Sequence, residues 1–461
     1  MADWPDQLAI NAWTGEDQPA SDVSDQARKW AIQRQVEVPQ LLAPPPAVDQ
    51  RDWRHAEVGW GLVLPEDEQV PAADRAVGAD APAAIRKLLA DRAGAPVFRY
   101  RPDLHNRFLR RYYTDRPAQD IALSGSPRGT GPGRLPRYLL LCGSPEVLPW
   151  DLQYVLNTAA FVGRLDLDEE GLEHYVGALI AGWKDASCRP AQPVVWTVDH
   201  GPSDITFLMR RAIAEPVAAD LKNDSQIGDG LRRLAGADAT AGALIDTLAA
   251  RQPALVVSTS HGMTGPLADP ALMAAQLGFL VDGGHAALGP DELLKEWQPD
   301  GAIWYAHACC SAGSDRRTRY KGLVAAGSSV EKVLEAVAGL GARVAPLPRR
   351  LLGAEKPLRA FVGHVEPTFD WTLRAETGQT LTTTIQQALY NRLYSAEPVG
   401  MAFQDVYRHV GELLAQWSQA FDEVNQGIPD ARAAALRSQL TALDRQSMVI
   451  LGDPTACLPP L

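Results

Sequence analysis

The stretch GAIWYAHACCSAGSD (Gly301–Asp315) joins a short apolar run to two adjacent cysteines and then to small polar residues. Continuous apolar runs with aromatic and β-branched residues are typical of strands that are buried on both faces of a sheet. Cys309 and Cys310 come where such a strand would end, and the chain of 461 residues holds five cysteines in all. Two of five thiols at one strand end indicate a chemical role for this stretch.

Similar apolar runs recur along the chain, and each ends in Gly, Pro, Asp or His. They are RYLLLCGSP (Arg137–Pro145), PVVWTVDHG (Pro193–Gly201), PALVVSTSHG (Pro253–Gly262) and LRAFVGHVE (Leu358–Glu366). Helical patterns lie between them, at Ile205–Leu221, Ala239–Arg251 and Ser328–Leu340. Strands that alternate with helices imply right-handed crossovers. The sequence therefore predicts an α/β fold with a doubly wound, mostly parallel sheet flanked by helices, an α/β/α sandwich.

The first part of the chain has a different character. Residues 1–135 are irregular in composition, although HAEVGWGLVLP favours a strand and APAAIRKLLADRA favours a helix. The segment SGSPRGTGPGRLP (Ser124–Pro136) is typical of a linker or an exposed loop. We expect an N-terminal extension over residues 1–135, small α/β or irregular, a first subdomain over 136–192 and a larger domain over 193–461. Near the C-terminus, ARAAALRSQLTALDRQS predicts one more amphipathic helix.

Composition excludes several classes of partner. The formal net charge of −12 argues against binding to nucleic acid or to an anionic membrane, because both require a basic face. No apolar stretch approaches the roughly 18 residues that span a bilayer, and the N-terminus lacks a basic, apolar leader. Apart from the adjacent pair, the cysteines form no framework and no zinc-like spacing. We expect a cytoplasmic protein without a bound metal.

Chemically capable residues follow nearly every predicted strand. Open parallel sheets carry their functional groups at the carboxyl ends of the strands. These ends hold Cys142, Asp199–His200, His261–Gly262, Cys309–Cys310 and Gly363–His364. This distribution is typical of an active site.

A nucleophilic cysteine requires a base or a cationic neighbour, because the thiolate is the attacking form. His261 is the best partner for Cys309, since the 48 residues between them (309 − 261) leave room for one helical crossover between adjacent strands. Gly262 lacks a Cβ, so its amide can approach a substrate carbonyl and stabilise a developing oxyanion. The amide of the nucleophile itself would be the second donor.

The strand ending in His–Gly, followed by one ending in Ala–Cys, resembles the caspase-like (clan CD) cysteine peptidases, which include caspases, gingipains, separase and bacterial CHAT proteases. HACCSAG is similar to the Ala-Cys-x-Ser/Thr-x-Gly form of CHAT proteins, and VILGDPTACLP also looks like gingipain and CHAT-type domains. The resemblance covers about residues 136–461. It implies a gingipain-like first subdomain over 136–192 and a caspase-like catalytic domain over 193–461. Within that domain it implies His261, Gly262 and Cys309 as the catalytic residues.

Alternatives remain open at this stage. Cys310 is an alternative nucleophile, although neighbouring side chains on an extended chain face opposite ways, so only one of the pair can enter a cleft. His200 and His364 also end strands; either could be the base, and both are candidates for the pocket lining. His307 would share the face of Cys309, and we expect it to be a satisfied histidine at the strand end.

The residue preference at the cleavage site is predicted from the strand ends. In caspases an arginine near the end of the first core strand binds aspartate, whereas the comparable stretch here supplies Asp199. A carboxylate at the base of the pocket would pair with Arg or Lys of a substrate, and Glu366 could reinforce it. The competing interpretation is that Asp199 caps the following helix or holds His200.

The resulting hypothesis is a cysteine endopeptidase, a thiol-protease hydrolase that needs no cofactor. It would form a thioester acyl-enzyme and perform limited proteolysis of a protein or peptide substrate. The resemblance to CHAT proteases implies a partner such as a bacterial gasdermin in defence, and the Ala-rich composition favours a bacterial source. The alternative class is a catalytically silent caspase-like interaction scaffold. The chain has no G-x-S-x-G elbow and no G-x-x-x-x-G-K-[ST] loop, which argues against a serine hydrolase or a nucleotide-binding protein.

Overall fold

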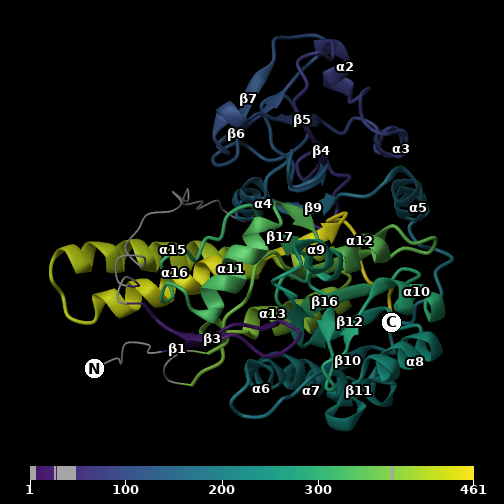
Figure 1. The fold of residues 1–461 in the computed structure, drawn as a ribbon. Coiled ribbons are helices and arrows are strands. Elements are labelled where there is room, and N and C mark those ends of the chain that lie inside the picture. The colour runs from purple at the N-terminus through teal and green to yellow at the C-terminus, as the bar shows by residue number, and fades with distance from the viewer. Residues whose placement is uncertain (1–6, 25–26, 28–47, 375–377) are drawn as a thin grey trace.

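A single twelve-stranded, mostly parallel sheet dominates the computed structural model, which describes residues 7–24, 27, 48–374 and 378–461 (Figure 1). Across the sheet the strands run β11 (Arg232–Ala235), β10 (Val194–Thr197), β12 (Leu255–Thr259), β16 (Ile303–His307), β19 (Ala360–His364), β20 (Met448–Gly452), β9 (Phe161–Leu165), β8 (Tyr138–Cys142), β4 (Trp60–Pro65), β5 (Val97–Tyr100), β6 (Phe108–Arg111) and β7 (Gln119–Ala122). Antiparallel pairings occur at β19–β20, β5–β6 and β6–β7.

Helices flank the sheet on both faces because its central strands carry apolar side chains on both faces. In β16, Trp304 and Ala306 pack into one hydrophobic layer, whereas Ile303 and Tyr305 pack into another. The helices are α2 (Ala72–Val77), α3 (Ala83–Asp91), α4 (Trp150–Asn157), α5 (Glu169–Ile180), α6 (Ile205–Met209), α7 (Glu215–Asn223), α8 (Ala241–Arg251), α9 (Pro270–Gln276), α10 (Pro290–Glu296), α11 (Ser329–Gly339), α12 (Pro346–Leu352), α13 (Thr383–Gln387), α14 (Val399–Ala402), α15 (Gln404–Asn425) and α16 (Ala431–Ser447). The predicted class, α/β with a mostly parallel sheet between helices, is confirmed.

The five predicted strands all form, as β8, β10, β12, β16 and β19. HAEVGWGLVLP contributes β4, and the predicted C-terminal helix is α16. One predicted helix is interrupted: the stretch Ile205–Leu221 contains a π-helical turn at Arg210–Ala214. Pro216 has no amide hydrogen to donate to Ala212, and the hydroxyl of Thr382 donates to that carbonyl instead, at 2.5 Å. The π turn thus has a local cause, which periodicity alone does not reveal.

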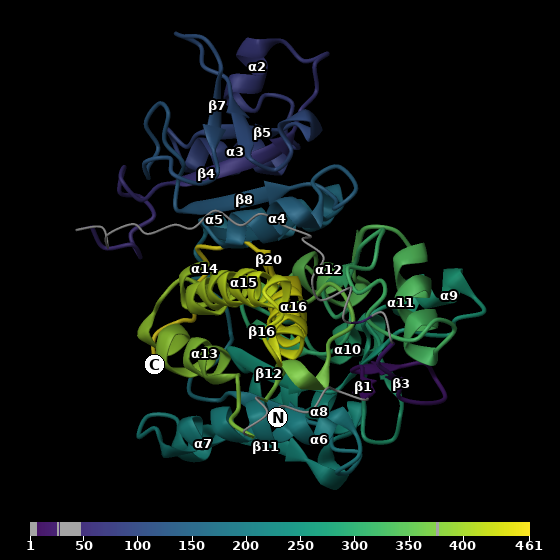
Figure 2. The same cartoon turned by 90° about the vertical axis from the view of Figure 1, so that its left-hand side faces the viewer.

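The sheet crosses the boundary that we predicted at residue 135. β4 and β8 lie on its two sides and pair in parallel over Trp60–Val63, so this part of the chain shares one sheet. Figure 2 shows the part that carries β4 and β8 stacked on the part that carries β12 and β16. The C-terminal strand β20 lies between β19 and β9 and joins the two parts. The division into 1–135, 136–192 and 193–461 stays a prediction.

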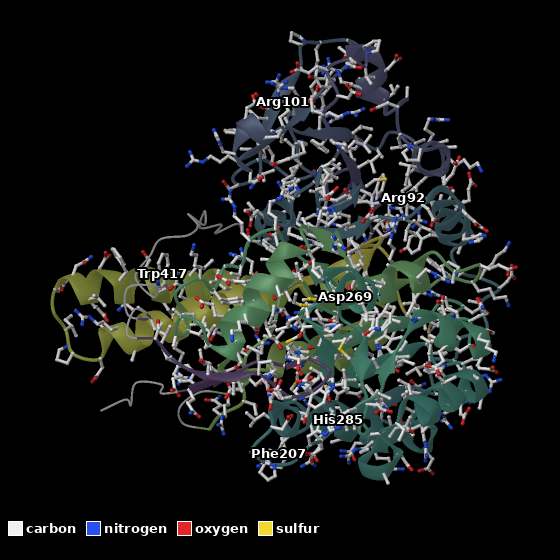
Figure 3. All side chains as sticks on the ribbon, viewed as in Figure 1. Arg92, Arg101, Phe207, Asp269, His285 and Trp417 are labelled. Carbon is white, nitrogen blue, oxygen red and sulfur yellow. The ribbon has the colours of Figure 1, made fainter. Side chains whose placement is uncertain are left out.

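A buried carboxylate fixes the end of β20 to the upper part of the molecule. Asp453 accepts hydrogen bonds from the indole of Trp60, at 3.0 Å, and from the guanidinium of Arg92, at 3.1 Å. The side chains of Arg92 and Asp453 are 4% and 0% exposed. Arg92 is labelled in Figure 3, at the junction of the two parts. Removing one member of such a pair leaves the other charge buried and unpaired.

A second, smaller sheet and a helical hairpin complete the fold. The small sheet has the order β15 (Ala287–Leu288), β14 (Leu280–Val281), β13 (His261–Met263) and β2 (Ala12–Trp13). Helices α15 and α16 form the hairpin that projects at the left of Figure 1. Among the helices in the described parts of the chain, none is both long and apolar enough to cross a membrane.

We predict that Asp453→Ala lowers the free energy of unfolding by about 3–5 kcal/mol, because it leaves the buried Arg92 guanidinium without its carboxylate partner. Urea unfolding followed by circular dichroism measures the change. Glu173→Ala is the matched control, since the Lys87–Glu173 ion pair is exposed and its loss costs at most about 1 kcal/mol. Equal losses for the two variants would contradict the assigned role of Asp453.

Candidate active site

The candidate residues come together because three strand ends are level with one another. Thr197 of β10 pairs with Thr259 of β12, and Thr259 pairs with His307 of β16. His261 and Cys309 come two residues after Thr259 and His307, just beyond the ends of the adjacent parallel strands β12 and β16. The single-crossover relation predicted for His261 and Cys309 is therefore what the sheet shows.

Gly262 stands against the backbone of the proposed nucleophile. A Cβ built on Gly262 would lie 1.9 Å from the carbonyl oxygen of Cys309 and 2.9 Å from its nitrogen. No other residue fits there without moving the main chain, because real Cβ atoms do not approach backbone atoms so closely. The requirement for glycine is thus steric, and it brings the amides of residues 262 and 309 side by side.

These two amides donate to one oxygen. The N–H of Cys309 and the N–H of Gly262 both bond to the main-chain carbonyl of Asn11, at 3.1 Å and 3.4 Å. Two backbone donors that converge on a single carbonyl oxygen have the arrangement of an oxyanion hole. They are the two donors that the sequence predicts, and the carbonyl that they hold belongs to the N-terminal stretch of the same chain.

His261 is oriented by a carboxylate that the sequence analysis did not single out. Its Nε2 lies 3.0 Å from Oδ2 of Asp204, while its Nδ1 is buried and has no hydrogen-bond partner within the described residues. Burial opposes ionisation of Asp204, but its bonds to His261 and Thr206 outweigh that effect and lower its pKa to about 2. A charged carboxylate on Nε2 leaves Nδ1 as the nitrogen that can exchange a proton with a thiol or a leaving group.

His200 lies beside the proposed base. Its ring stacks on His261, with centroids 5.7 Å apart, and on His285, with centroids 4.3 Å apart. Burial lowers the pKa of His200. The lowered pKa favours a neutral His200 ring beside His261, and its role in the pocket lining stays a prediction. His285, which is labelled in Figure 3, had no motif to reveal it.

The two cysteines differ in conformation and contacts. Sγ of Cys309 accepts a hydrogen bond from the amide of Thr368 at 3.2 Å, and the residue is fully buried. Burial raises the pKa of the Cys309 thiol, and the Thr368 bonds oppose that rise. Cys310 adopts a left-handed backbone conformation, with φ of 54°, and its pKa is also raised, first by burial and then by Cys309. The left-handed residue turns the chain at once after Cys309.

The side chains of three further predicted site residues have partners outside the group formed by His261, Gly262 and Cys309. Asp199 forms an ion pair with Arg210, at 2.9 Å, and accepts the amide of Gly201. His364 is fully buried, and its Nε2 contacts Nδ1 of His307 at 3.3 Å. Glu366 is 3% exposed and its carboxylate accepts the amide of Arg319. None of these contacts joins them to the group formed by His261, Gly262 and Cys309.

Asp204 and Thr368, which contact His261 and Cys309, were also missed by the sequence analysis. Asp204 stands at the N-terminus of α6, where its carboxylate accepts the amide of Thr206. An Asp between the strand β10 and an apolar helical run indicates a helix cap, and a helix start at this edge of the sheet also faces the site. Thr368 follows β19 and makes its contacts through the backbone, which side-chain motifs do not report.

Metal binding finds no support in the described ranges of the chain. No group of three or more His, Cys, Asp or Glu side chains among them is arranged to hold an ion. The functional groups that the structure provides at the candidate site are a thiol, an imidazole, a carboxylate and two backbone amides.

We predict that Glu366→Gln stabilises the protein at about pH 8 but not at about pH 5. Burial raises the pKa of Glu366 to about 8, so the folded protein keeps a proton that the unfolded chain has lost. The free energy of unfolding of the wild type then falls as pH rises between the ordinary pKa of the group and about 8. Glutamine removes this titration.

Urea unfolding at both pH values tests this, and we expect a gain of more than about 1 kcal/mol at the higher pH only. The exposed Glu355→Gln is the control, with equal stability changes at the two pH values. A gain for Glu366→Gln that does not depend on pH would contradict the assignment.

The comparisons with known proteins leave the family open. A scan against protein-family models finds no match to this chain, and a search of curated proteins finds none either.

Proposed function

We propose that the chain is a cysteine endopeptidase with a caspase-like catalytic domain, in which Cys309 is the nucleophile and His261 the acid and base. The observation that carries the proposal is the convergence of the Gly262 and Cys309 amides on one carbonyl oxygen. Peptide hydrolysis requires such donors, because charge develops on the carbonyl oxygen in the transition state. The sequence resemblance to caspase-like peptidases supports the same roles for these residues.

In the proposed reaction His261 takes the proton of the Cys309 thiol at its free Nδ1. The thiolate attacks the carbonyl carbon of the substrate, and the two amides hold the resulting oxyanion. His261 then returns the proton to the amine that leaves. Water hydrolyses the thioester and restores the thiol. Asp204 keeps the imidazole oriented and stabilises its protonated form, as the third member of such a triad does.

The proposal extends to the setting of the enzyme only through the resemblance to CHAT proteases. That resemblance implies regulated, limited proteolysis of a partner, such as a bacterial gasdermin in defence. The predicted preference for Arg or Lys rests on Asp199, and it stays a prediction. The ion pair with Arg210 gives the Asp199 carboxylate a partner within the chain, which does not favour that preference.

We predict that Cys309→Ala abolishes hydrolysis of a fluorogenic peptide library and labelling by a thiol-directed peptide electrophile. Loss of the nucleophile costs about a thousandfold or more in rate. Cys310→Ala is the matched control and keeps most of the activity. An inactive Cys310→Ala beside an active Cys309→Ala would transfer the role to Cys310. A wild type that neither hydrolyses nor reacts would favour the interaction scaffold.

We predict that His261→Ala lowers kcat by about 10²–10⁴-fold without unfolding the protein, because it removes proton transfer. The kcat of Asp204→Asn lies between that of His261→Ala and that of the wild type, since the imidazole remains but loses its anionic partner. His200→Ala is the control and changes the rate least. Peptide hydrolysis measures the rates, and circular dichroism checks the fold. An inactive His200→Ala variant together with an active His261→Ala variant would overturn the assignment of His261 as the acid and base.

A further inference from the structure

The N-terminal stretch of the chain lies across the candidate active site. Its strands β1 (Gln7–Ala9) and β3 (Ala20–Asp22) appear in purple in Figure 1, beneath α11 and far from β4. We call residues 7–23 the N-terminal segment. Leu8, Ile10 and Ala12 of this segment are buried in the same hydrophobic cluster as Cys309 and Cys310. The segment is therefore an integral part of the site's surroundings.

The backbone of the N-terminal segment forms hydrogen bonds with the rest of the chain on two sides. Ile10 forms an antiparallel bridge with Phe369, and the amide of Asn11 donates to the carbonyl of Thr368 at 2.9 Å. On the other side Ala12–Trp13 pairs in parallel with Gly262–Met263. An extended strand that adds to exposed main-chain edges is the way in which many domains bind peptides. The segment thus lies as a bound peptide would.

Asn11 is the residue of the segment that lies against the proposed oxyanion donors. Its carbonyl oxygen receives the amides of Gly262 and Cys309, the two proposed oxyanion donors. Thr368 accepts the amide of Asn11 and donates its own amide to Sγ of Cys309, so one residue links the Asn11 backbone to the thiol. The carbonyl in an oxyanion hole is the one that a nucleophile attacks. The bond that would break is therefore Asn11–Ala12.

The side chain of Asn11 is enclosed by the protein and uses its amide nitrogen as a donor. The residue is fully buried, and its Nδ2 donates to the main-chain carbonyl of His307 at 3.3 Å. Within the described residues its Oδ1 is buried and without a hydrogen-bond partner. An aspartate would place a negative charge against the His307 carbonyl, with no donor to compensate. The contact thus favours asparagine over its charged isostere.

Residues on both sides of the Asn11–Ala12 bond are held in place. The ring of Trp13 stacks on His285, with centroids 4.0 Å apart, and its carbonyl accepts the amide of Thr264 at 3.0 Å. Upstream, the amide of Ile10 donates to Pro19 at 3.1 Å, and β1 pairs with β3. The residues on each side of the Asn11–Ala12 bond are therefore held by contacts of their own. Both new chain ends would keep these contacts after cleavage.

We propose that the enzyme cleaves after asparagine and that its first substrate is its own Asn11–Ala12 bond. This inference rests on the proposed function of Cys309 and His261. The Cys309 thiol loses its proton to His261 and forms a thioester with the carbonyl carbon of Asn11. The Asn11–Ala12 C–N bond breaks, and the amine of Ala12 takes the proton. Water then hydrolyses the thioester, which leaves a carboxylate on Asn11 and restores the thiol.

Mass spectrometry of the denatured full-length protein tests the self-cleavage. We expect incubation of the wild type to yield a new N-terminus at Ala12, with the sequence AWTGED, and no such product from Cys309→Ala. Asn11→Asp slows the appearance of the product by about tenfold or more, since a charge is buried without a partner. Asn425→Gln, at an exposed asparagine, is the matched control and leaves the cleavage unchanged.

Peptide hydrolysis separates a failure of this inference from a failure of the proposed function. We expect the full-length enzyme to cut a peptide ending in Leu-Ala-Ile-Asn about tenfold to a hundredfold faster than the matched peptides ending in Asp, Arg or Lys. An enzyme that cuts peptides in a Cys309-dependent way, but keeps Asn11–Ala12 intact or prefers Arg, Lys or Asp, overturns this inference alone. A chain without hydrolysis and without cleavage overturns both.

Discussion

The close approach of two backbones, at Gly262 and Cys309, is the constraint on which the site depends. A single added carbon on residue 262 would collide with the main chain of residue 309. Its absence lets two amides point at the same oxygen, which neither strand could achieve alone. This approach in turn requires β12 and β16 to be adjacent, parallel and in register at Thr259 and His307. The buried layers on both faces of the sheet maintain that register, because a slip by one residue would exchange the two faces.

The environment of the thiol is set by the segment that covers it. Leu8, Ile10 and Ala12 join a hydrophobic cluster with both cysteines, α11 and the α15–α16 hairpin. Because this cluster excludes water, it raises the pKa of the Cys309 thiol, and the Thr368 amide offsets only part of that rise. The raised pKa favours the neutral thiol. In the proposed mechanism His261 would accept its proton at Nδ1, and the Asp204 carboxylate on the other side of the ring would stabilise the resulting imidazolium.

Much of the architecture could be predicted, because the signals were local. Buried parallel strands are continuous apolar runs, so the five predicted strands correspond to β8, β10, β12, β16 and β19. The spacing of His261 and Cys309 was compatible with one crossover, and the sheet order bears that out. The helix over Ile205–Leu221 was less accurate, because it contains a π turn at Arg210–Ala214, and the Ala212 carbonyl there accepts a hydrogen bond from Thr382, far along the chain.

The sequence by itself predicted six strands of the central sheet and several of the helices, since each depends on near neighbours in the chain, and it singled out Cys309, His261 and Gly262 as candidates. Only the tertiary structure decided which groups surround them. Asp204 reaches His261 across 57 residues, and Asn11 reaches the Cys309 amide across almost 300. Such contacts leave no periodic pattern, because they depend on where whole elements pack. The same limit explains Asp199, whose carboxylate the folded chain pairs with Arg210.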